Sequence, residues 1–221
     1  ELRRVSLVIG VMFLSLFASS TGIQVISADS LAADGRNVRS VYDSYETQRG
    51  DILIDGEPIA KSVKTDDEYH YLREYTSSRY SAVTGYFSFF NGATGLEAAS
   101  NDFLNGKNSS QFFEQINALF SGNPVTVGSV ELTIDPKVQK AAWDALGDMK
   151  GAVVAIDPAT GNILAMVSKP GFDANLLSTH DPVEANENYK NLLERKSDPL
   201  INRAIGGDLY VGGSSLNIAP E

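Results

Sequence analysis

The sequence predicts an α+β fold in which one apolar helix comes first and the part from Ser129 onward forms an antiparallel sheet covered by helices. Three observations carry this prediction. The stretch Val5–Val25 holds no charged residue. A helical pattern with an N-cap and a glycine stop covers residues 135–147. It leads directly into two apolar strands, 152–156 and 163–167, and a helix followed by a hairpin is typical of an antiparallel sheet with covering helices.

The 221 residues are 43% hydrophobic and 21% charged, the composition of a folded chain with one or two domains. The chain has no cysteine, so disulfide bonds and thiolate metal sites are excluded. His70 and His180 stand far apart without metal-ligand spacing, so we expect neither a metal site nor another cofactor. The net charge is −10 and no basic cluster alternates with aromatic residues, which disfavours nucleic acid as a partner.

The first residues predict a membrane anchor. Val5–Val25 is about 21 residues long and would span ~32 Å as a helix, enough to cross the ~30 Å hydrocarbon core of a bilayer. Arg3 and Arg4 precede this stretch and Asp29 is the first charge after it. The positive-inside rule then places the N-terminus in the cytoplasm and the rest of the chain outside. We therefore expect residues 1–28 to be a single-pass signal anchor in the cytoplasmic membrane.

A cleaved signal peptide is the alternative for this segment. Its strongly apolar part covers only Val5–Ala18, and Ile26–Ala28 could serve as a cleavage site. The anchor is the favoured interpretation, and both interpretations export the rest of the chain. Because the chain starts at Glu1 rather than at methionine, we also expect residues upstream of it to have been lost.

Residues 49–60 predict a β-hairpin. Ile52 and Ile54 alternate before Asp55-Gly56, which is the strongest short turn signal in the chain, and apolar residues follow it. Arg49 stands just before this hairpin. It could bind a substrate, but a structural salt bridge or a clamp on backbone carbonyls is the favoured role.

Aromatic residues crowd the stretch from Tyr69 to Phe90. They could line a glycan-binding groove, but packing in strands and core is favoured, and the alternation in Tyr69–Leu72 supports a half-buried strand. Farther on, apolar residues recur at helical spacing in Phe112–Phe120, and Gly122 and Pro124 end that predicted helix. The aromatic set comprises Tyr69, Tyr71, Tyr75, Tyr80, Tyr86, Phe87, Phe89 and Phe90.

The part of the chain from Ser129 onward starts with a predicted strand at Val130–Ile134. A helix follows, because Asp135 is a good N-cap and Pro136 fits the first helical position. Gly147 ends this helix.

The two apolar strands that come next are joined by Asp157–Asn162. This segment predicts a type I turn with Gly161 at the left-handed position. After the hairpin, a long polar stretch runs from Pro170 to Asp198, to which we assign no particular element.

Four motifs stand in a recognisable order. They are Arg49-Gly50-Asp51-Ile52, Leu132-Thr133-Ile134-Asp135-Pro136 with Gln139, the block from Gly151 to Val167, and Asn202-Arg203-Ala204-Ile205. Together they resemble the N-terminal half of a class B penicillin-binding protein, of the short actinobacterial type called penicillin-binding protein A. The strand-turn-strand block is specific, whereas Arg-Gly-Asp-Ile alone would be weak. The resemblance covers nearly the whole chain up to Ile205.

This resemblance implies a membrane-anchored serine transpeptidase that cross-links peptidoglycan. It implies an elongated mixed α/β pedestal over residues 29–128 and the edge of a transpeptidase domain, with an antiparallel sheet, over 129–221. In such proteins a serine attacks the D-Ala-D-Ala carbonyl of a stem peptide, a lysine three residues on takes its proton, and backbone N–H groups hold the oxyanion. β-Lactams acylate the same serine. The implied partner is a RodA/FtsW-type glycan polymerase, contacted through the anchor helix and the pedestal.

The sequence departs from this family after Ile205, where the family continues into Tyr-Pro-Pro-Gly-Ser-x-x-Lys. Ser214 could be aligned with the nucleophile, but Asn217 then stands where the base lysine is required, and a neutral amide cannot take the proton. We therefore predict no catalytic residue in this chain and expect it to be inactive alone. Residues 216–221 resemble a much later part of the transpeptidase domain. We expect 206–221 to be non-contiguous with the rest, with the catalytic core missing between them.

The sequence thus predicts the anchor, pedestal and transpeptidase edge of a peptidoglycan D,D-transpeptidase. Two alternatives stay open. One is a non-catalytic, membrane-anchored scaffold that only activates the polymerase. The other is an exported glycan-binding module that uses the aromatic stretch. The motifs do not distinguish a role in elongation from a role in division.

Overall fold

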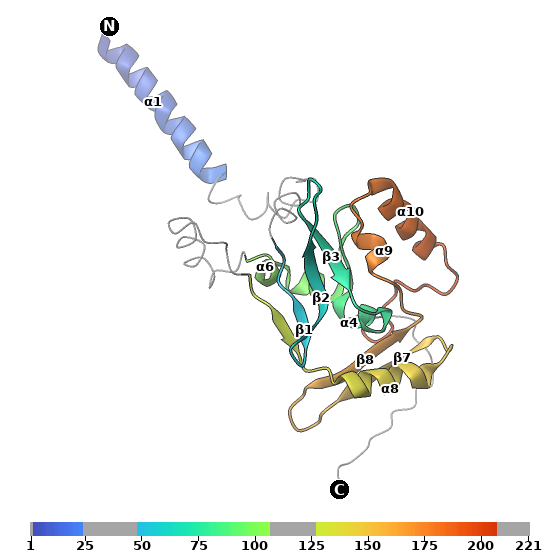
Figure 1. The fold of residues 1–221 in the computed structure, drawn as a ribbon. Helices are drawn as coiled ribbons and strands as arrows, with labels where there is room; N and C mark the ends of the chain where they lie inside the picture. Colours follow the sequence, from blue (N-terminus) through green and yellow to red (C-terminus); the bar gives the residue numbers. More distant parts are fainter. Residues whose placement is uncertain (1, 24–47, 107–126, 207–221) are drawn as a thin grey trace. The chain divides into compact units, whose positions relative to one another are not determined.

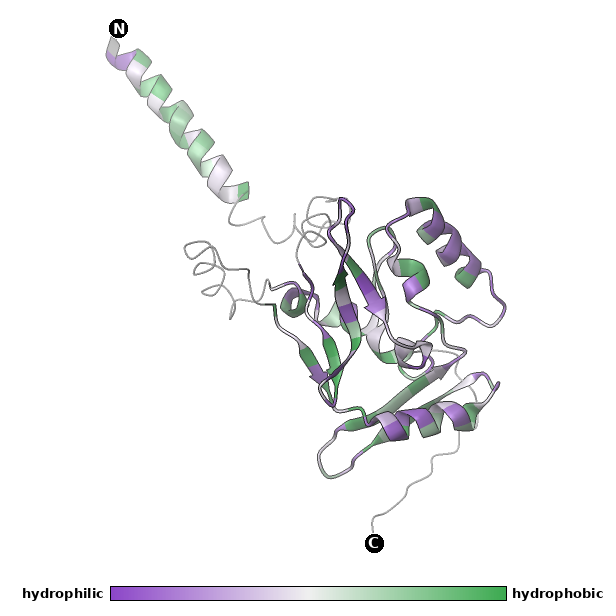
Figure 2. Ribbon diagram, viewed as in Figure 1, coloured by the Kyte–Doolittle hydropathy of each residue, from purple (hydrophilic) through white to green (hydrophobic). Residues whose placement is uncertain are grey.

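The computed structural model of the chain describes residues 2–23, 48–106 and 127–206 (Figure 1). The chain divides into two compact units, residues 1–43 and 44–221. The first unit contains helix α1 (Leu2–Thr21), and its apolar side chains are exposed. Figure 2 shows the hydrophobic character of most of this helix. By length and composition α1 could cross a membrane, so the predicted N-terminal apolar helix is present.

The second unit contains a four-stranded sheet with the strand order β3-β2-β1-β6. Its members are β1 (Ile52–Ile54), β2 (Glu57–Lys64), β3 (Tyr71–Tyr75) and β6 (Val130–Leu132). The first three strands pair antiparallel, but β6 runs parallel to β1. This sheet is therefore mixed, with one parallel pair. A parallel pair needs a long crossover connection, and residues 55–129 supply it.

The predicted hairpin at Asp55-Gly56 is confirmed. Both residues have positive φ, 51° and 77°, as a type I′ turn requires. Ile52 and Ile54 of β1 are buried with at most 2% of their surface exposed, which matches the alternation in the sequence.

The strand expected to begin at Tyr69 begins two residues later, at Tyr71. Tyr69 and His70 belong to the turn that precedes β3, where His70 has a φ of 63°. The carboxylate of Asp67 shapes this turn, since it accepts hydrogen bonds from the hydroxyl of Thr65 and from the backbone N–H of Tyr69. A local side-chain hydrogen bond therefore outweighs the alternating pattern.

Short elements follow β3. They are a 3-10 helix η2 (Ser78–Tyr80), α4 (Ser81–Thr84), β4 (Phe87–Ser88), β5 (Gly92–Ala93), α5 (Gly95–Ala99) and α6 (Asn101–Leu104). The helix predicted over Phe112–Phe120 lies outside the described residues.

The predicted helix and hairpin after residue 134 are confirmed. Helix α8 (Pro136–Leu146) begins at Asp135, whose carboxylate accepts hydrogen bonds from two backbone N–H groups, and it ends at Gly147 with a φ of 47°. Strands β7 (Gly151–Ile156) and β8 (Ile163–Lys169) pair antiparallel. Gly161 in the connecting turn has a φ of 77°, the left-handed conformation that the sequence predicted.

The polar stretch after β8 contains two helices that the pattern did not predict, α9 (Asn175–Ser178) and α10 (Pro182–Leu193). The carboxylate of Asp181 accepts hydrogen bonds from the N–H groups of Val183 and Glu184, so α10 has a complete N-cap. Ala185 and Leu192 are buried. These two residues stand seven positions apart, about two turns, so one narrow stripe of α10 is buried while most of its residues are polar.

The core connects the parts on either side of residue 128. Ile52, Tyr75 and Tyr86 from the first part pack in one cluster with Phe172 and Leu177 from the second. The boundary predicted between residues 128 and 129 stays a prediction, and β6 on its far side completes the sheet that begins on its near side.

Candidate functional site

A buried ion cluster ties together the segment before β1, strand β3 and helix α5. Glu97 of α5 is fully buried, and its carboxylate accepts hydrogen bonds from Arg49 Nε at 2.6 Å and Arg73 Nε at 2.7 Å. The hydroxyl of Tyr75 donates a third, at 3.2 Å. Each arginine is 2% exposed. We call this set the Arg49–Glu97–Arg73 cluster.

The remaining nitrogen atoms of Arg49 are also engaged. Nη2 donates to the backbone carbonyl of Glu97 at 2.6 Å, and Nη1 donates to the amide oxygens of Asn101 and Asn105. The guanidinium lies over the ring of Phe87, 4.2 Å from its centroid. Arg49 is therefore both an ion-pair partner and a carbonyl clamp, which confirms the favoured prediction.

The cluster brings two cations and one anion out of water. Arg73 Nη1 donates to the carbonyl of Gly50, but Arg73 Nη2 is buried and has no hydrogen-bond partner among the described residues. Burial lowers the pKa of Arg49, and the charge and hydrogen bonds of Glu97 oppose that effect. Burial, together with the charge of Glu97, raises the pKa of Tyr75 well above its ordinary value, so its phenol stays protonated and donates to the carboxylate. The cluster serves to position three elements.

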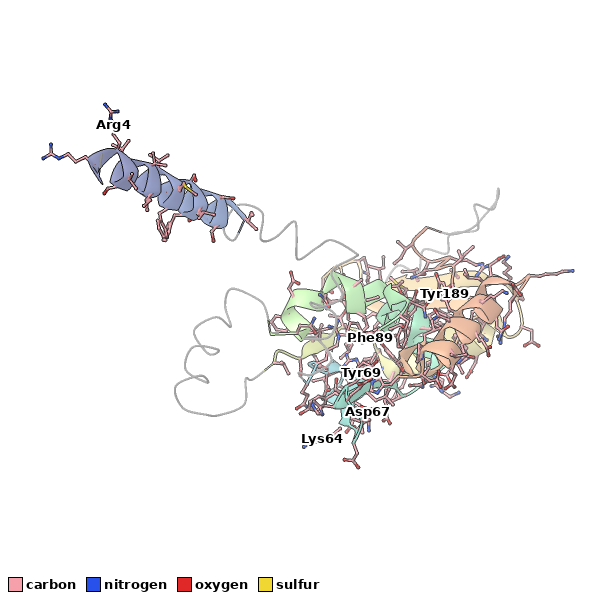
Figure 3. The ribbon with its side chains drawn as sticks, turned by 90° about the horizontal axis from the view of Figure 1, so that it is seen from above. Arg4, Lys64, Asp67, Tyr69, Phe89 and Tyr189 are labelled. Atoms are coloured by element: carbon pink, nitrogen blue, oxygen red, sulfur yellow. The ribbon has the colours of Figure 1, made fainter. Side chains whose placement is uncertain are left out.

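The aromatic stretch divides between core and surface. Tyr75, Tyr86 and Phe87 are buried, so the prediction of core packing is confirmed for them. Tyr69 and Phe89 are partly exposed and meet edge to face, with ring centroids 5.1 Å apart (Figure 3). Their rings therefore pack against each other.

A groove of about 500 Å³ lies beside strand β3. It is lined by Leu72 and Glu74 of β3, by Asp67 of the preceding turn, and by Asn175 and His180 from the segment after β8. We call it the β3 groove. The amide of Asn175 binds the edge of β3, accepting from the N–H of Tyr75 at 2.8 Å and donating to its carbonyl at 2.9 Å.

Gln139, part of a motif that carries the family resemblance, joins α8 to its surroundings. Its side chain is fully buried. Nε2 donates to the carbonyls of Arg79 and Met166, at 2.8 and 2.9 Å, and Oε1 accepts from the N–H of Met166 at 2.8 Å. Gln139 thus positions α8 against β8.

The Asn-Arg-Ala-Ile motif is held just as firmly. The guanidinium of Arg203 donates to the carbonyls of Ser197, Asp198 and Ile201, at 3.0 to 3.3 Å. Its backbone N–H donates to the hydroxyl of Ser168 in β8 at 3.0 Å. In the same motif, the Asn202 side chain donates to the carbonyl of Ala82 in α4 at 2.7 Å. These contacts set the path of the chain as far as Gly206.

Ser214 and Asn217, the residues weighed for catalysis, lie outside the described residues. Sequence reasoning missed Arg73 and Glu97. A signal for Arg73 did exist, because alternation in Tyr71–Tyr75 places it on the same face as two tyrosines. No local signal marked Glu97, whose partners stand 24 and 48 positions away.

Residues 49–130 match a family described as the penicillin binding protein A dimerisation domain. That region begins at the first residue of the ion cluster and ends in β6. The peptidoglycan D,D-transpeptidase PbpA of Mycolicibacterium smegmatis is 43% identical over 224 residues, which cover 99% of this chain and 45% of the relative. The protein of the same name from Mycobacterium tuberculosis is 40% identical over the same shares.

The chain belongs to the class B penicillin-binding proteins, of the penicillin-binding protein A type. It spans less than half the length of these relatives. Solved structures agree with this assignment. Penicillin-binding protein A from M. tuberculosis, as its imipenem acyl-enzyme complex, has a TM-score of 0.72 at 40% identity, covering 74% of this chain and 39% of that chain. The D,D-transpeptidase domain of an Eggerthella lenta protein has a TM-score of 0.56 at 35% identity, covering 73% of this chain and 33% of that one.

Proposed function

We propose that this chain is the anchor, pedestal and transpeptidase edge of a peptidoglycan D,D-transpeptidase that cross-links stem peptides outside the cytoplasmic membrane. The observation that carries the proposal is 43% identity to a D,D-transpeptidase over 99% of the chain. In this proposal residues 1–28 cross the membrane once, with the N-terminus in the cytoplasm. Residues 29–128 form the pedestal, and residues 129–221 belong to the catalytic domain.

The exposed face of β7 supports the assignment of an incomplete catalytic domain. Val154 and Ile156 are 41% and 56% exposed, and Ile205 at the end of the described chain is 73% exposed. Apolar side chains at such exposure on one strand are typical of a surface that another part of the protein covers. We assign that cover to the part of the parent protein that this chain does not span. We further propose that residues 206–221 are non-contiguous with residue 205.

The proposed reaction is acyl transfer through a serine. The M. tuberculosis protein has been solved as acyl-enzyme complexes with imipenem and ceftriaxone, so β-lactams acylate that protein. In the parent protein a Ser-x-x-Lys sequence after Ile205 would supply the nucleophile and its base. The residues of this chain would hold the segment that leads to it, through Arg203, Asn202 and Ser168. A RodA/FtsW-type glycan polymerase is the proposed partner of the anchor helix and pedestal.

Fluorescent penicillin tests this function directly. The complete coding sequence, including the region after Ile205, is expressed in membranes and incubated with the probe. We expect one covalently labelled band that unlabelled imipenem abolishes, while the chain of 221 residues stays unlabelled. Absence of labelling in the complete protein would favour the non-catalytic scaffold instead.

A further inference from the structure

Asn202, the first residue of the Asn-Arg-Ala-Ile motif, contacts a part of the chain that lies 120 positions away. Its Nδ2 donates to the backbone carbonyl of Ala82 in α4 at 2.7 Å, and its Oδ1 accepts from the backbone N–H of Ala204 at 3.1 Å. A carbonyl can only accept and a backbone N–H can only donate, so a single orientation of the amide satisfies both partners. The side chain of Asn202 therefore joins α4 to the backbone of its own motif.

The carbonyl of Ala82 is available because α4 ends after one turn. In a longer helix this carbonyl would accept from the N–H of Tyr86, four residues on. That N–H donates instead to the hydroxyl of Thr94 at 3.3 Å, and Gly85 ends the helix. A carbonyl at a helix end needs a partner from elsewhere when it is buried. Since Ala82 is buried, the Asn202 amide supplies that partner.

The end of α4 is fixed against the start of α5. A Cβ atom on Gly85 would lie 2.1 Å from the carbonyl oxygen of Thr94, and one on Gly95 would lie 2.7 Å from the backbone nitrogen of Gly85. The backbone N–H of Thr94 also donates to the carbonyl of Tyr86 at 3.0 Å. The two helices therefore meet backbone to backbone, so the position of α4 depends on α5, the helix that carries the buried Glu97.

The residues on either side of Asn202 are bound to β8. The hydroxyl of Ser168 donates to the carbonyl of Ile201 at 3.1 Å and accepts from the N–H of Arg203 at 3.0 Å. Asn202 thus stands between two residues that are attached to β8, and its own amide attaches the motif to α4.

Side chains do not fill this junction completely. A pocket of about 70 Å³ lies where α4, the start of α5 and the motif meet, and its lining includes Ala82, Gly95 and Asn202. In a closely packed interior, contacts on all sides would fix the distance between α4 and the motif. Because space remains beside the Asn202–Ala82 hydrogen bond, we expect the motif to shift relative to α4 when this bond is lost.

We propose that Asn202 is a positioning residue for the acylation step, because it ties the segment leading to the nucleophile to α4. This inference rests on the proposed function, in which the parent protein carries a Ser-x-x-Lys sequence after Ile205. Asn202 acts on the backbone before that sequence. A nucleophile displaced by about 1 Å reacts about 100-fold more slowly. The Asn202–Ala82 bond therefore affects the rate constant of acylation more than the binding of the β-lactam.

Acylation kinetics of the complete protein in detergent test this role. Labelling by fluorescent penicillin is followed over a range of probe concentrations, and saturation separates the dissociation constant of the noncovalent complex from the rate constant of acylation. Asn202→Asp keeps the acceptor for the N–H of Ala204 but has no N–H to donate to Ala82. We expect its rate constant of acylation to fall about 10- to 100-fold, while its dissociation constant changes by less than about twofold.

Asn188→Asp is the matched control. Asn188 Nδ2 donates to the carbonyl of Leu176 at 3.0 Å, so this variant loses the same kind of hydrogen bond away from the motif. It should acylate at the rate of the unaltered protein. Asn202→Ala places no charge beside the carbonyl of Ala82 and should lose as much as Asn202→Asp. The final labelled fraction reports how much of each variant is folded, so the rate constants refer to folded protein.

Two results would overturn the positioning role and leave the proposed function intact. One is a rate constant of acylation in Asn202→Asp or Asn202→Ala equal to that of the unaltered protein. The other is an equal fall in the Asn188→Asp control. If the unaltered complete protein were not labelled at all, the proposed function would fail, and this inference with it.

Discussion

Single residues hold the second unit together through side chains that act over long sequence distances. Glu97 accepts hydrogen bonds from two arginines and a tyrosine in a buried site. Such an ion pair is weak evidence of net stability, because burying three charges costs much of what their attraction supplies. Its effect lies in specificity, since only one arrangement of β3, α5 and the segment before β1 satisfies all three partners.

Replacing Glu97 by glutamine tests this view. The change keeps the shape of the side chain but leaves two buried guanidinium groups without a counter-charge, so we expect the free energy of unfolding to fall by about 3–5 kcal/mol. Urea denaturation of the full chain measures it. Glu74→Gln is the matched control, because the pair that Glu74 forms with Lys61 is exposed and should contribute no more than about 1 kcal/mol. Similar losses in both variants would contradict the proposed role of burial.

Asp67 makes the free energy of unfolding depend on pH in the acidic range. Burial raises the pKa of its carboxyl, but hydrogen bonds from His180 and Thr65 and the charge of His180 outweigh burial, so the pKa lies below the ordinary 3.8. A carboxyl whose pKa is lower in the folded chain than in the unfolded chain stabilises the folded protein at pH values above its unfolded-state pKa. This stabilisation is lost as the pH falls through the folded-state pKa. We expect Asp67→Asn to be less stable than the unaltered chain at pH 6 and equal to it near pH 2. Asp66→Asn should show no such difference, and a gap that persisted at pH 2 would count against this account.

Elements meet closely where glycine permits it. A Cβ atom on Gly50 would lie 1.9 Å from the carbonyl oxygen of Gly128, so the backbones leading into β1 and β6 approach closer than any side chain allows. This contact lies beside the parallel pairing of β1 with β6. Close backbone packing therefore explains why glycine stands at position 50 of the Arg-Gly-Asp-Ile motif.

We expect Gly50→Ala to lower the free energy of unfolding by at least about 2 kcal/mol, because the backbone of one strand must move. Gly151→Ala in β7 is a matched control, since its Cβ would meet only Leu146, at 3.7 Å, an ordinary contact. Thermal unfolding followed by circular dichroism compares the two. If Gly50→Ala unfolded at the same temperature as the control, the close approach of the two backbones would not contribute to stability.

Helix α10 shows why a helix can be missed when the sequence is read for hydrophobic periodicity. Its Asp181-Pro182 start is the same signal as Asp135-Pro136, from which α8 was predicted. The apolar stripe that should follow is thin, because only Ala185 and Leu192 are buried. The cap signal was therefore present, but the helix was not predicted because hydrophobic periodicity did not accompany it.

At the scale of the whole molecule, the proposed topology depends on α1. Nothing else in the described residues is both long and apolar enough to cross a bilayer. Arg3 and Arg4 lie in the first turn of this helix, and positive charges at that end favour a cytoplasmic N-terminus.

Deleting residues 2–23 from the full-length protein tests the anchor. We expect the protein to move from the membrane fraction to the soluble fraction, because the remaining chain has no comparable apolar helix within the described residues. Protease added to intact spheroplasts should digest the body of the unaltered protein. Protection of the body until lysis would reverse the orientation.

The sequence by itself determined what depends on neighbours in the chain. The apolar helix, the Asp55-Gly56 turn, the cap at Asp135 and the β7–β8 hairpin all follow from contacts within a few residues, and the structure contains each of them. The motifs were also enough to recognise the family, because each is a run of neighbouring residues and their order along the chain can be seen in the sequence.

Only the tertiary structure decided which distant groups meet. It paired β6 with β1 in parallel, buried Arg73 and Arg49 against Glu97, and brought His180 to Asp67, 113 positions away. The physical reason is that burial and long-range hydrogen bonds are settled by the packing of whole elements. The conformational preferences of short segments do not determine which buried charges form a pair.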